Sequence, residues 1–165
     1  MIELKKSGLV GFIGLTGTGC ATCLRTVIRS GVFDTIQIPY NLLNPSAGHE
    51  VDDECLERNY GNLLADSLQM DMGAFAIRIF AGGALLGRSA SAHTLTTPFF
   101  PLELYRQDVI QSVSLRREYG LNVLIQRAIE FALQHPAVHS AIIGFGRSQE
   151  VDAAANSTNG LGRIR

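Results

Sequence analysis

An α/β fold with a parallel sheet is the class that this sequence of 165 residues predicts. Short apolar runs alternate with helix-like stretches four times, in the order β-α-β-α-β-α-β-α. Such alternation is typical of parallel strands joined by right-handed helical crossovers. Two architectures fit this order, an open doubly wound sheet and a segment of a (β/α)8 barrel. In both, the functional edge is the carboxyl end of the strands.

The first half of the chain contains two predicted strand–helix units. Residues 9–16 form a short apolar run bounded by glycines, as in a buried strand, and a helix is expected over residues 20–30. Residues 33–40 are rich in β-forming side chains and lead through a loop to a helix predicted over residues 53–70.

The second half predicts two further units. A strand is expected over residues 73–80, ending in a flexible Ala81-Gly82-Gly83, and residues 87–101 form a long irregular segment of the kind that is functional or mobile. The remaining predicted elements are helices near residues 103–119 and 122–134, a strand over 139–143 and a last helix from 148 to 155.

Composition and charge exclude several classes of protein. The chain is 46% hydrophobic and 18% charged, with a formal net charge of −1. These values indicate a globular domain and no nucleic-acid or anionic-membrane partner. The longest apolar stretch, residues 73–86, contains Arg78 and is too short to span a bilayer, and the N-terminus lacks a signal-peptide pattern. We therefore expect one cytoplasmic domain over residues 1–165.

The three cysteines do not form the even framework of a secreted protein. Cys20-Ala21-Thr22-Cys23 has the spacing of a redox motif and lies near a strand-to-helix junction, where a thiol pKa is lowered. The interpretation that the sequence favours is two small residues that happen to lie three apart on a helix. A zinc site is not predicted, because no second ligand pair has suitable spacing.

Glycines near both ends of the chain stand where nucleotide-binding motifs would place them only in part. Gly17-Thr18-Gly19 is not followed by the third glycine of a dinucleotide-binding turn, and the second strand ends without a ribose-binding carboxylate. The turn from Gly144 to Ser148 places glycines before a helix, where backbone N–H groups and Arg147 suit a phosphate. A plain turn with a solvent-facing arginine explains that motif equally well.

Four segments are similar, in order and over nearly the whole chain, to one known family. The segments are Gly11-Phe12-Ile13-Gly14-Leu15-Thr16-Gly17, Gln37-Ile38-Pro39-Tyr40-Asn41-Leu42, Ala76-Ile77-Arg78-Ile79-Phe80-Ala81-Gly82-Gly83-Ala84-Leu85 and the stretch from Ala128 to Val151. They resemble strand five, the Q-x-x-Y-N segment, strand seven and the ending of the aldo-keto reductases. The resemblance implies strands and helices 5–8 of a TIM-type (β/α)8 barrel, a (βα)4 half.

The resemblance also implies an oxidoreductase that uses NADP(H) or NAD(H) on carbonyls, sugars or alcohols. Thr16 and Gln37 would meet the nicotinamide carboxamide, the segment after the third strand would lie beside the nicotinamide and pyrophosphate, and Arg147 would favour a 2′-phosphate. The cofactor-binding residues that the resemblance implies are Thr16, Gln37, Arg78, Phe80, Ala81, Gly82, Gly144, Phe145, Gly146, Arg147 and Glu150.

Other positions differ from the family's usual residues. Gly17 replaces an asparagine, Ile77 replaces an aromatic ring, and Ala153 and Ala154 stand where adenine contacts are expected. These differences predict impaired cofactor binding.

No catalytic residue is expected in the chain, because the family's tyrosine, lysine, histidine and aspartate belong to the first half of the barrel. Lys5 and Lys6 are the only lysines, and they precede the first strand at the edge opposite the expected mouth. Geometry thus excludes a Tyr–Lys pair. The remaining candidates have simpler expected roles: packing for Tyr40, exposed loop positions for His49 and His93, and capping of a helix end for His135 and His139.

The beginning of the chain looks like the tail of the helix before strand five, so we expect a C-terminal portion of a longer reductase. Four strands cannot close a barrel, and open edges with exposed apolar side chains predict self-association. Three functions stay open at this point. They are a portion that is inactive alone, an enzyme completed by a partner or a second copy, and a non-catalytic nucleotide-binding or interaction module.

Overall fold

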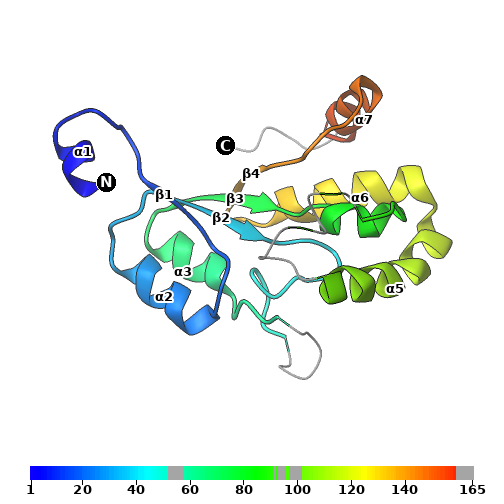
Figure 1. Cartoon of the computed structure of the whole chain (residues 1–165), viewed down its shortest axis with the longest axis horizontal. Helices are drawn as coiled ribbons and strands as arrows, with labels where there is room; N and C mark the ends of the chain where they lie inside the picture. Colours follow the sequence, from blue (N-terminus) through cyan, green and yellow to red (C-terminus); the bar gives the residue numbers. More distant parts are fainter. Residues whose placement is uncertain (52–57, 91, 93–95, 97–101, 159–165) are drawn as a thin grey trace.

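The computed structural model describes residues 1–51, 58–90, 92, 96 and 102–158, and it confirms the predicted α/β class. Four parallel strands form one sheet in the order β1-β2-β3-β4 (Figure 1). The strands are β1 (Gly14–Thr16), β2 (Thr35–Pro39), β3 (Gly73–Ile77) and β4 (Val138–Ala141). The helices within the described residues are α1 (Ile2–Lys6), α2 (Ala21–Arg29), α3 (Leu63–Gln69), the 3-10 helix η2 (Ala81–Leu86), α5 (Leu102–Tyr119), α6 (Leu121–Gln134) and α7 (Ser148–Thr158).

The two faces of the sheet differ in exposure. Ile36 and Ile38 on β2, and Ala74 and Ala76 on β3, are fully buried in the core. Successive side chains of a strand point to opposite faces, so the residues between them form the second face. That face is more open, and Gln37 is exposed on it. A sheet that is fully buried on one face and partly open on the other fits the expected half of a barrel.

Two ion-pair groups fix the outer helices. Asp66 on α3 is almost completely buried and accepts hydrogen bonds from Arg25 Nε at 2.8 Å and Arg29 Nη2 at 2.7 Å, which join α3 to α2. Lys5 on α1 donates to Asp34 Oδ1 at 2.5 Å, just before β2. This contact confirms that Lys5 lies at the amino edge of the sheet.

The helix predicted over residues 53–70 is wrong in its start. The helix α3 begins only at Leu63, because Gly61 and Asn62 have left-handed φ values of 57° and 56°. An asparagine adopts this conformation more readily than most side chains, and it ends helical periodicity here. Residues 53–57 of the predicted helix lie outside the described residues.

Other elements differ in extent from their predictions. β1 is limited to three residues at the end of the predicted run, and β3 ends at Ile77, before the left-handed Arg78 (φ 58°). The Ala81-Gly82-Gly83 turn is the first part of η2. Part of the predicted irregular segment, including His93, lies outside the described residues. The two long helices are confirmed, and each begins one residue earlier than predicted.

His139 is not a helix cap, so that expectation is wrong. It lies within β4, and its Nδ1 accepts the Ala74 N–H of β3 at 3.1 Å. The register of the β3–β4 pair shifts at this point, between Ala74 and Phe75. The imidazole thus takes a hydrogen bond that the strand ladder leaves open. Across the described part of the chain, no helix combines the length and apolarity needed for a membrane span.

Candidate functional site

Thr16 and Gln37 form the first part of the site at the carboxyl edge of the sheet. They are paired in the register of β1 and β2, and both are exposed. The hydroxyl of Thr16 can donate or accept a hydrogen bond, and the amide of Gln37 can do both. These are the groups that a ligand amide requires, so the structure brings these two predicted residues together.

Gly17 follows directly, and the structure explains why no asparagine stands there. Its N–H donates to the Gln37 carbonyl at 2.6 Å. A Cβ atom on Gly17 would lie 3.0 Å from Ile36 Cδ1 and 3.1 Å from that carbonyl oxygen. A side chain at this position would therefore press against the backbone of β2. The packing of this chain therefore explains why Gly17 stands in place of the family's usual asparagine.

The second part of the site is a cavity of about 560 Å³ between the turn after β3, α6 and the start of α7. Apolar side chains line one part of it and charged side chains line another. The lining residues are Phe80, Leu86, Arg88, Ile125, Gly144, Phe145, Arg147, Gln149, Glu150, Ala153 and Ala154. Seven of these residues were named from the sequence: Phe80, Gly144, Phe145, Arg147 and Glu150 as cofactor contacts, and Ala153 and Ala154 as departures from the family's usual residues. A volume of this size is typical of small-molecule and cofactor sites.

Glu150 connects the two sides of this cavity. Its Oε2 accepts the Gly146 N–H at 2.8 Å, and its Oε1 accepts from Arg88 Nη2 at 2.5 Å. The Gly146 hydrogen bond and then Arg88 hold the pKa of the Glu150 carboxyl below its usual value. The Glu150 carboxylate therefore accepts the backbone N–H of Gly146, in the turn that the sequence predicted to bind a phosphate. The same carboxylate also holds Arg88 in place.

Arg147 is the cation that remains available to a ligand. Its side chain is exposed at the cavity rim, and it forms no ion pair with any described residue. Arg88 was not identified from the sequence, since its position at the cavity depends on a contact with Glu150, 62 residues away. The only available signal was its basic side chain at the start of a long irregular segment.

Arg78 is not brought into the large cavity. Its side chain is mostly buried and pairs with Asp108 at 3.4 Å, beside a separate cavity of about 40 Å³ that Tyr60 also lines. Burial lowers the pKa of Arg78, and Asp108 counteracts this effect. The Arg78 carbonyl accepts from Asn41 Nδ2 at 3.0 Å. These contacts fix the turn after β3 on which the next predicted residues stand.

Phe80, Ala81 and Gly82 occupy that turn. Phe80 lines the large cavity, whereas Ala81 is buried in the core and Gly82 is exposed with φ 68°. A Cβ atom on Gly82 would lie 3.3 Å from Arg78 Nη1. Of these three residues, only Phe80 presents a side chain to the cavity.

Tyr40 is a packing residue, as expected. It is fully buried, stacks on Phe131 and shares a hydrogen bond of 3.0 Å with His49 Nε2. Burial raises the pKa of Tyr40 to about 12. His49 is exposed, as predicted, and His135 at the end of α6 accepts the Ala137 N–H at 3.2 Å. The raised pKa of Tyr40 is the opposite of the shift that a tyrosine needs to act as the acid in carbonyl reduction.

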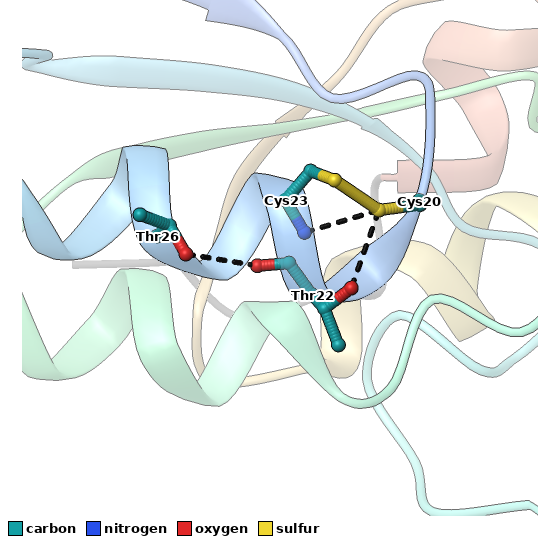
Figure 2. Close-up of a disulfide and its surroundings, with 4 residues drawn as sticks. All are labelled: Cys20, Thr22, Cys23 and Thr26. Carbon is teal, nitrogen blue, oxygen red and sulfur yellow. Dashed lines mark hydrogen bonds between the residues drawn. A yellow bond between two sulfur atoms is a disulfide. The ribbon is translucent and has the colours of Figure 1, made fainter.

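Cys20 and Cys23 are joined by a disulfide, so the interpretation as two unrelated small residues is wrong. The bond lies at the amino end of α2 (Figure 2). No group of His, Cys, Asp and Glu side chains among the described residues is suited to a metal ion.

Comparisons with known proteins show which protein family and which solved structures this chain is similar to. The sequence model of the aldo/keto reductase family matches residues 1–160. The fold is similar to the holo form of the aldo-keto reductase AKR11C1 from Bacillus halodurans, with a TM-score of 0.62 and 15% identity over 95% of this chain and 47% of that one. The apo form gives a TM-score of 0.60 and 16% identity over 95% and 48%. The chain thus spans about half the length of these structures. No curated protein sequence matches it.

Proposed function

Because the chain belongs to the aldo/keto reductase family, we propose that it is the C-terminal half of a reductase barrel that binds NADP(H) or NAD(H) and does not reduce carbonyls alone. The observation that carries this proposal is the cavity beside the start of α7, with Arg147 free at its rim. The cavity lies beyond the carboxyl ends of β3 and β4 in this (βα)4 fold, half of a (β/α)8 barrel, and this edge is where barrel enzymes bind ligands, which supports the proposal.

The two parts of the site suit the two ends of a dinucleotide. Thr16 and Gln37 lie on β1 and β2, and the cavity lies beyond β3 and β4. Three strand spacings, roughly 14 Å at about 4.8 Å each, separate β1 from β4. We assign the nicotinamide carboxamide to Thr16 and Gln37 and the adenosine part to the cavity. The bound cofactor would supply the hydride, while these side chains orient it.

The charges of the cavity favour a phosphate near Arg147 and a hydroxyl or amino group near Glu150. Like charges repel, so a phosphate fits beside Arg147 rather than beside Arg88, which is already paired with the Glu150 carboxylate. The small Ala153 and Ala154 leave space for an adenine ring but offer it no side-chain hydrogen bond. Affinity for the adenosine part would then depend mainly on Arg147 and on apolar contact.

We propose that the chain alone is inactive because it lacks a tyrosine–lysine pair that could donate the proton. Lys5 is paired with Asp34 at the amino edge, so it is far from the proposed nicotinamide position. Tyr40 is buried with a raised pKa. A half barrel that supplies the tyrosine and lysine would complete the enzyme. Without such a half, the chain would act as a nucleotide-binding module.

Titration of NADPH fluorescence tests cofactor binding. Arg147→Ala should weaken NADPH binding by roughly one to two powers of ten, since a charge-assisted hydrogen bond is worth about 1.5–3 kcal/mol. The weakening should be smaller for NADH if Arg147 contacts the 2′-phosphate. Arg117→Ala is the matched control, because Arg117 is exposed on α5 and does not line the cavity. Equal affinities of the two variants would contradict the assignment of Arg147.

An aldehyde-reduction assay tests the second part of the proposal. We expect NADPH binding without turnover by the chain alone, and turnover only after a catalytic half with a tyrosine and a lysine is added. Turnover by the chain alone would show that the family's tyrosine, lysine, histidine and aspartate need not come from another half barrel.

Self-association is the further expected property of this half barrel. β1 and β4 are the outer strands of the sheet, and Phe12 beside β1 and Ile142 beside β4 are 78% and 44% exposed. Unpaired strand edges with exposed apolar neighbours favour pairing with another chain. Size-exclusion chromatography with light scattering should show an oligomer, and a stable monomer at micromolar concentration would refute this expectation.

A further inference from the structure

The disulfide between Cys20 and Cys23 lies outside the proposed cofactor site and closes a loop of four residues. Both cysteines are exposed, at the amino end of the nine-residue helix α2. Figure 2 shows the bond on the first turn of this helix, with Thr22 beside it. A disulfide at an exposed position is accessible to thiols in solution.

The surroundings of Cys20 favour negative charge on its sulfur. Cys20 is the N-cap residue of α2, and its Sγ accepts the Cys23 N–H at 3.1 Å. The Oγ1 of Thr22 lies 3.3 Å from the same sulfur and can donate to it. The helix dipole adds a partial positive charge at this end. A thiolate on Cys20 would therefore gain stabilisation that Cys23, inside the helix, does not receive from these groups.

We propose that Cys20 and Cys23 form a reversible disulfide–dithiol site that exchanges with small thiol compounds, with Cys20 as the stabilised thiolate. This proposal does not rest on cofactor binding, since neither cysteine lines the cavity. It assigns a chemistry to the Cys-Ala-Thr-Cys motif that hydride transfer does not use.

The exchange has two steps. The thiolate of an incoming thiol attacks Cys23 Sγ, forms a mixed disulfide and breaks the Cys20–Cys23 bond, whose electron pair leaves on Cys20 Sγ. A second thiolate then attacks the sulfur of the first thiol, and the electron pair of the mixed disulfide leaves on Cys23. Two thiols are oxidised to one disulfide, and Cys20 and Cys23 gain two electrons and two protons. The reverse reaction oxidises the dithiol.

Reduction should leave the fold intact. The bond constrains only four residues, and the entropy that a disulfide removes from the unfolded chain grows with loop length. α2 is also held by the buried Leu24 and Ile28 and by the ion pairs of Arg25 and Arg29 with Asp66. The site can therefore change its redox state while the helix stays in place.

The test uses the full chain with Cys55→Ser, which removes the third thiol. The protein is equilibrated in buffers of reduced and oxidised glutathione, alkylated and weighed by mass spectrometry, while circular dichroism follows the fold. We expect oxidised and reduced forms to interconvert as the buffer ratio changes, with an unchanged spectrum. A bond that millimolar glutathione reduces only after the protein unfolds, or that does not form in the oxidising buffers, would overturn the proposal.

Single-cysteine variants test the assignment of the thiolate. In the Cys55→Ser background, Cys23→Ser leaves Cys20 alone and Cys20→Ser leaves Cys23 alone. At neutral pH, Cys20 should react with iodoacetamide about tenfold faster than Cys23, because alkylation requires the thiolate. Thr22→Val should slow alkylation of Cys20, whereas Thr26→Val, which loses only a bond to the Thr22 carbonyl, should not. Equal rates for the two cysteines would overturn the assignment.

Discussion

Replacement of Gly17 by the asparagine that is usual in the family should destabilise this protein. The Cβ atom alone would lie 3.0 Å from Ile36 Cδ1 and 3.1 Å from the carbonyl oxygen of Gln37. The first contact can relax by rotation of the isoleucine, but the second is with backbone that accepts the Gly17 N–H. Any shift of that carbonyl also displaces β2 next to the proposed nicotinamide position.

The magnitude follows from two opposing effects. Overpacking of a close contact costs about 1–3 kcal/mol. Loss of glycine's freedom in the unfolded chain stabilises the folded protein by about 0.4–1 kcal/mol. Gly17→Ala should thus lower the free energy of unfolding by about 0.5–2 kcal/mol, and Gly17→Asn should lower it more because its side chain is longer.

Urea unfolding followed by circular dichroism measures this difference. Gly11→Ala is the matched control, because a Cβ atom there would meet nothing within 4 Å and its φ is not in the left-handed region. That variant should be as stable as the unchanged protein or slightly more stable. The reasoning is refuted if Gly17→Ala is as stable as Gly11→Ala.

Three further outcomes are expected. Asp66→Ala should lower the free energy of unfolding by about 2 kcal/mol, because it removes the carboxylate that accepts charged hydrogen bonds from Arg25 and Arg29, a loss that solvent partly compensates. Glu130→Ala, which removes only an exposed hydrogen bond with Gln126 on α6, should change it by less than about 0.5 kcal/mol. Burial lowers the pKa of His135 below its usual 6.5, so its contribution to stability is full above pH 6.5 and declines as the pH falls below that value. A pH titration of stability should show this decline in the unchanged protein but not in His135→Gln. Glu150 has a lowered pKa, so its contribution is present above its usual value of 4.5 and is lost at more acidic pH, and Glu150→Gln should remove that loss.

The order of strands and helices could be predicted because it depends on local patterns. Residues 33–40, which are rich in β-forming side chains, contain β2, and the helices predicted near residues 103–119 and 122–134 correspond to α5 and α6 within one residue. The start of α3 could not be predicted, since the left-handed φ values of Gly61 and Asn62 end a side-chain pattern that continues through them. Conformation at a single residue is set by tertiary contacts that periodicity does not report.

The site shows the same division. Gly144, Arg147 and Glu150 stand within a few residues of one another, so a local motif could indicate them. Arg88 reaches Glu150 across 62 positions, and nothing in the sequence pairs the two. Arg78 was expected at the cofactor, yet its contact with Asp108 directs it to a different cavity. A resemblance assigns positions along the chain, whereas the direction of a long side chain depends on its neighbours.

The unequal pairing of the strands has a consequence for hydrogen exchange. β2 and β3 are paired on both sides, with fully buried side chains, whereas β1 is a three-residue outer strand. Amides of β2 and β3 should exchange only when the whole domain opens, and those of β1 and of the turn before α7 through smaller local openings. Thr16 and Arg147 thus belong to the parts of the molecule that open first. A ligand that bridges them would slow exchange there most, and leave the centre of the sheet almost unchanged.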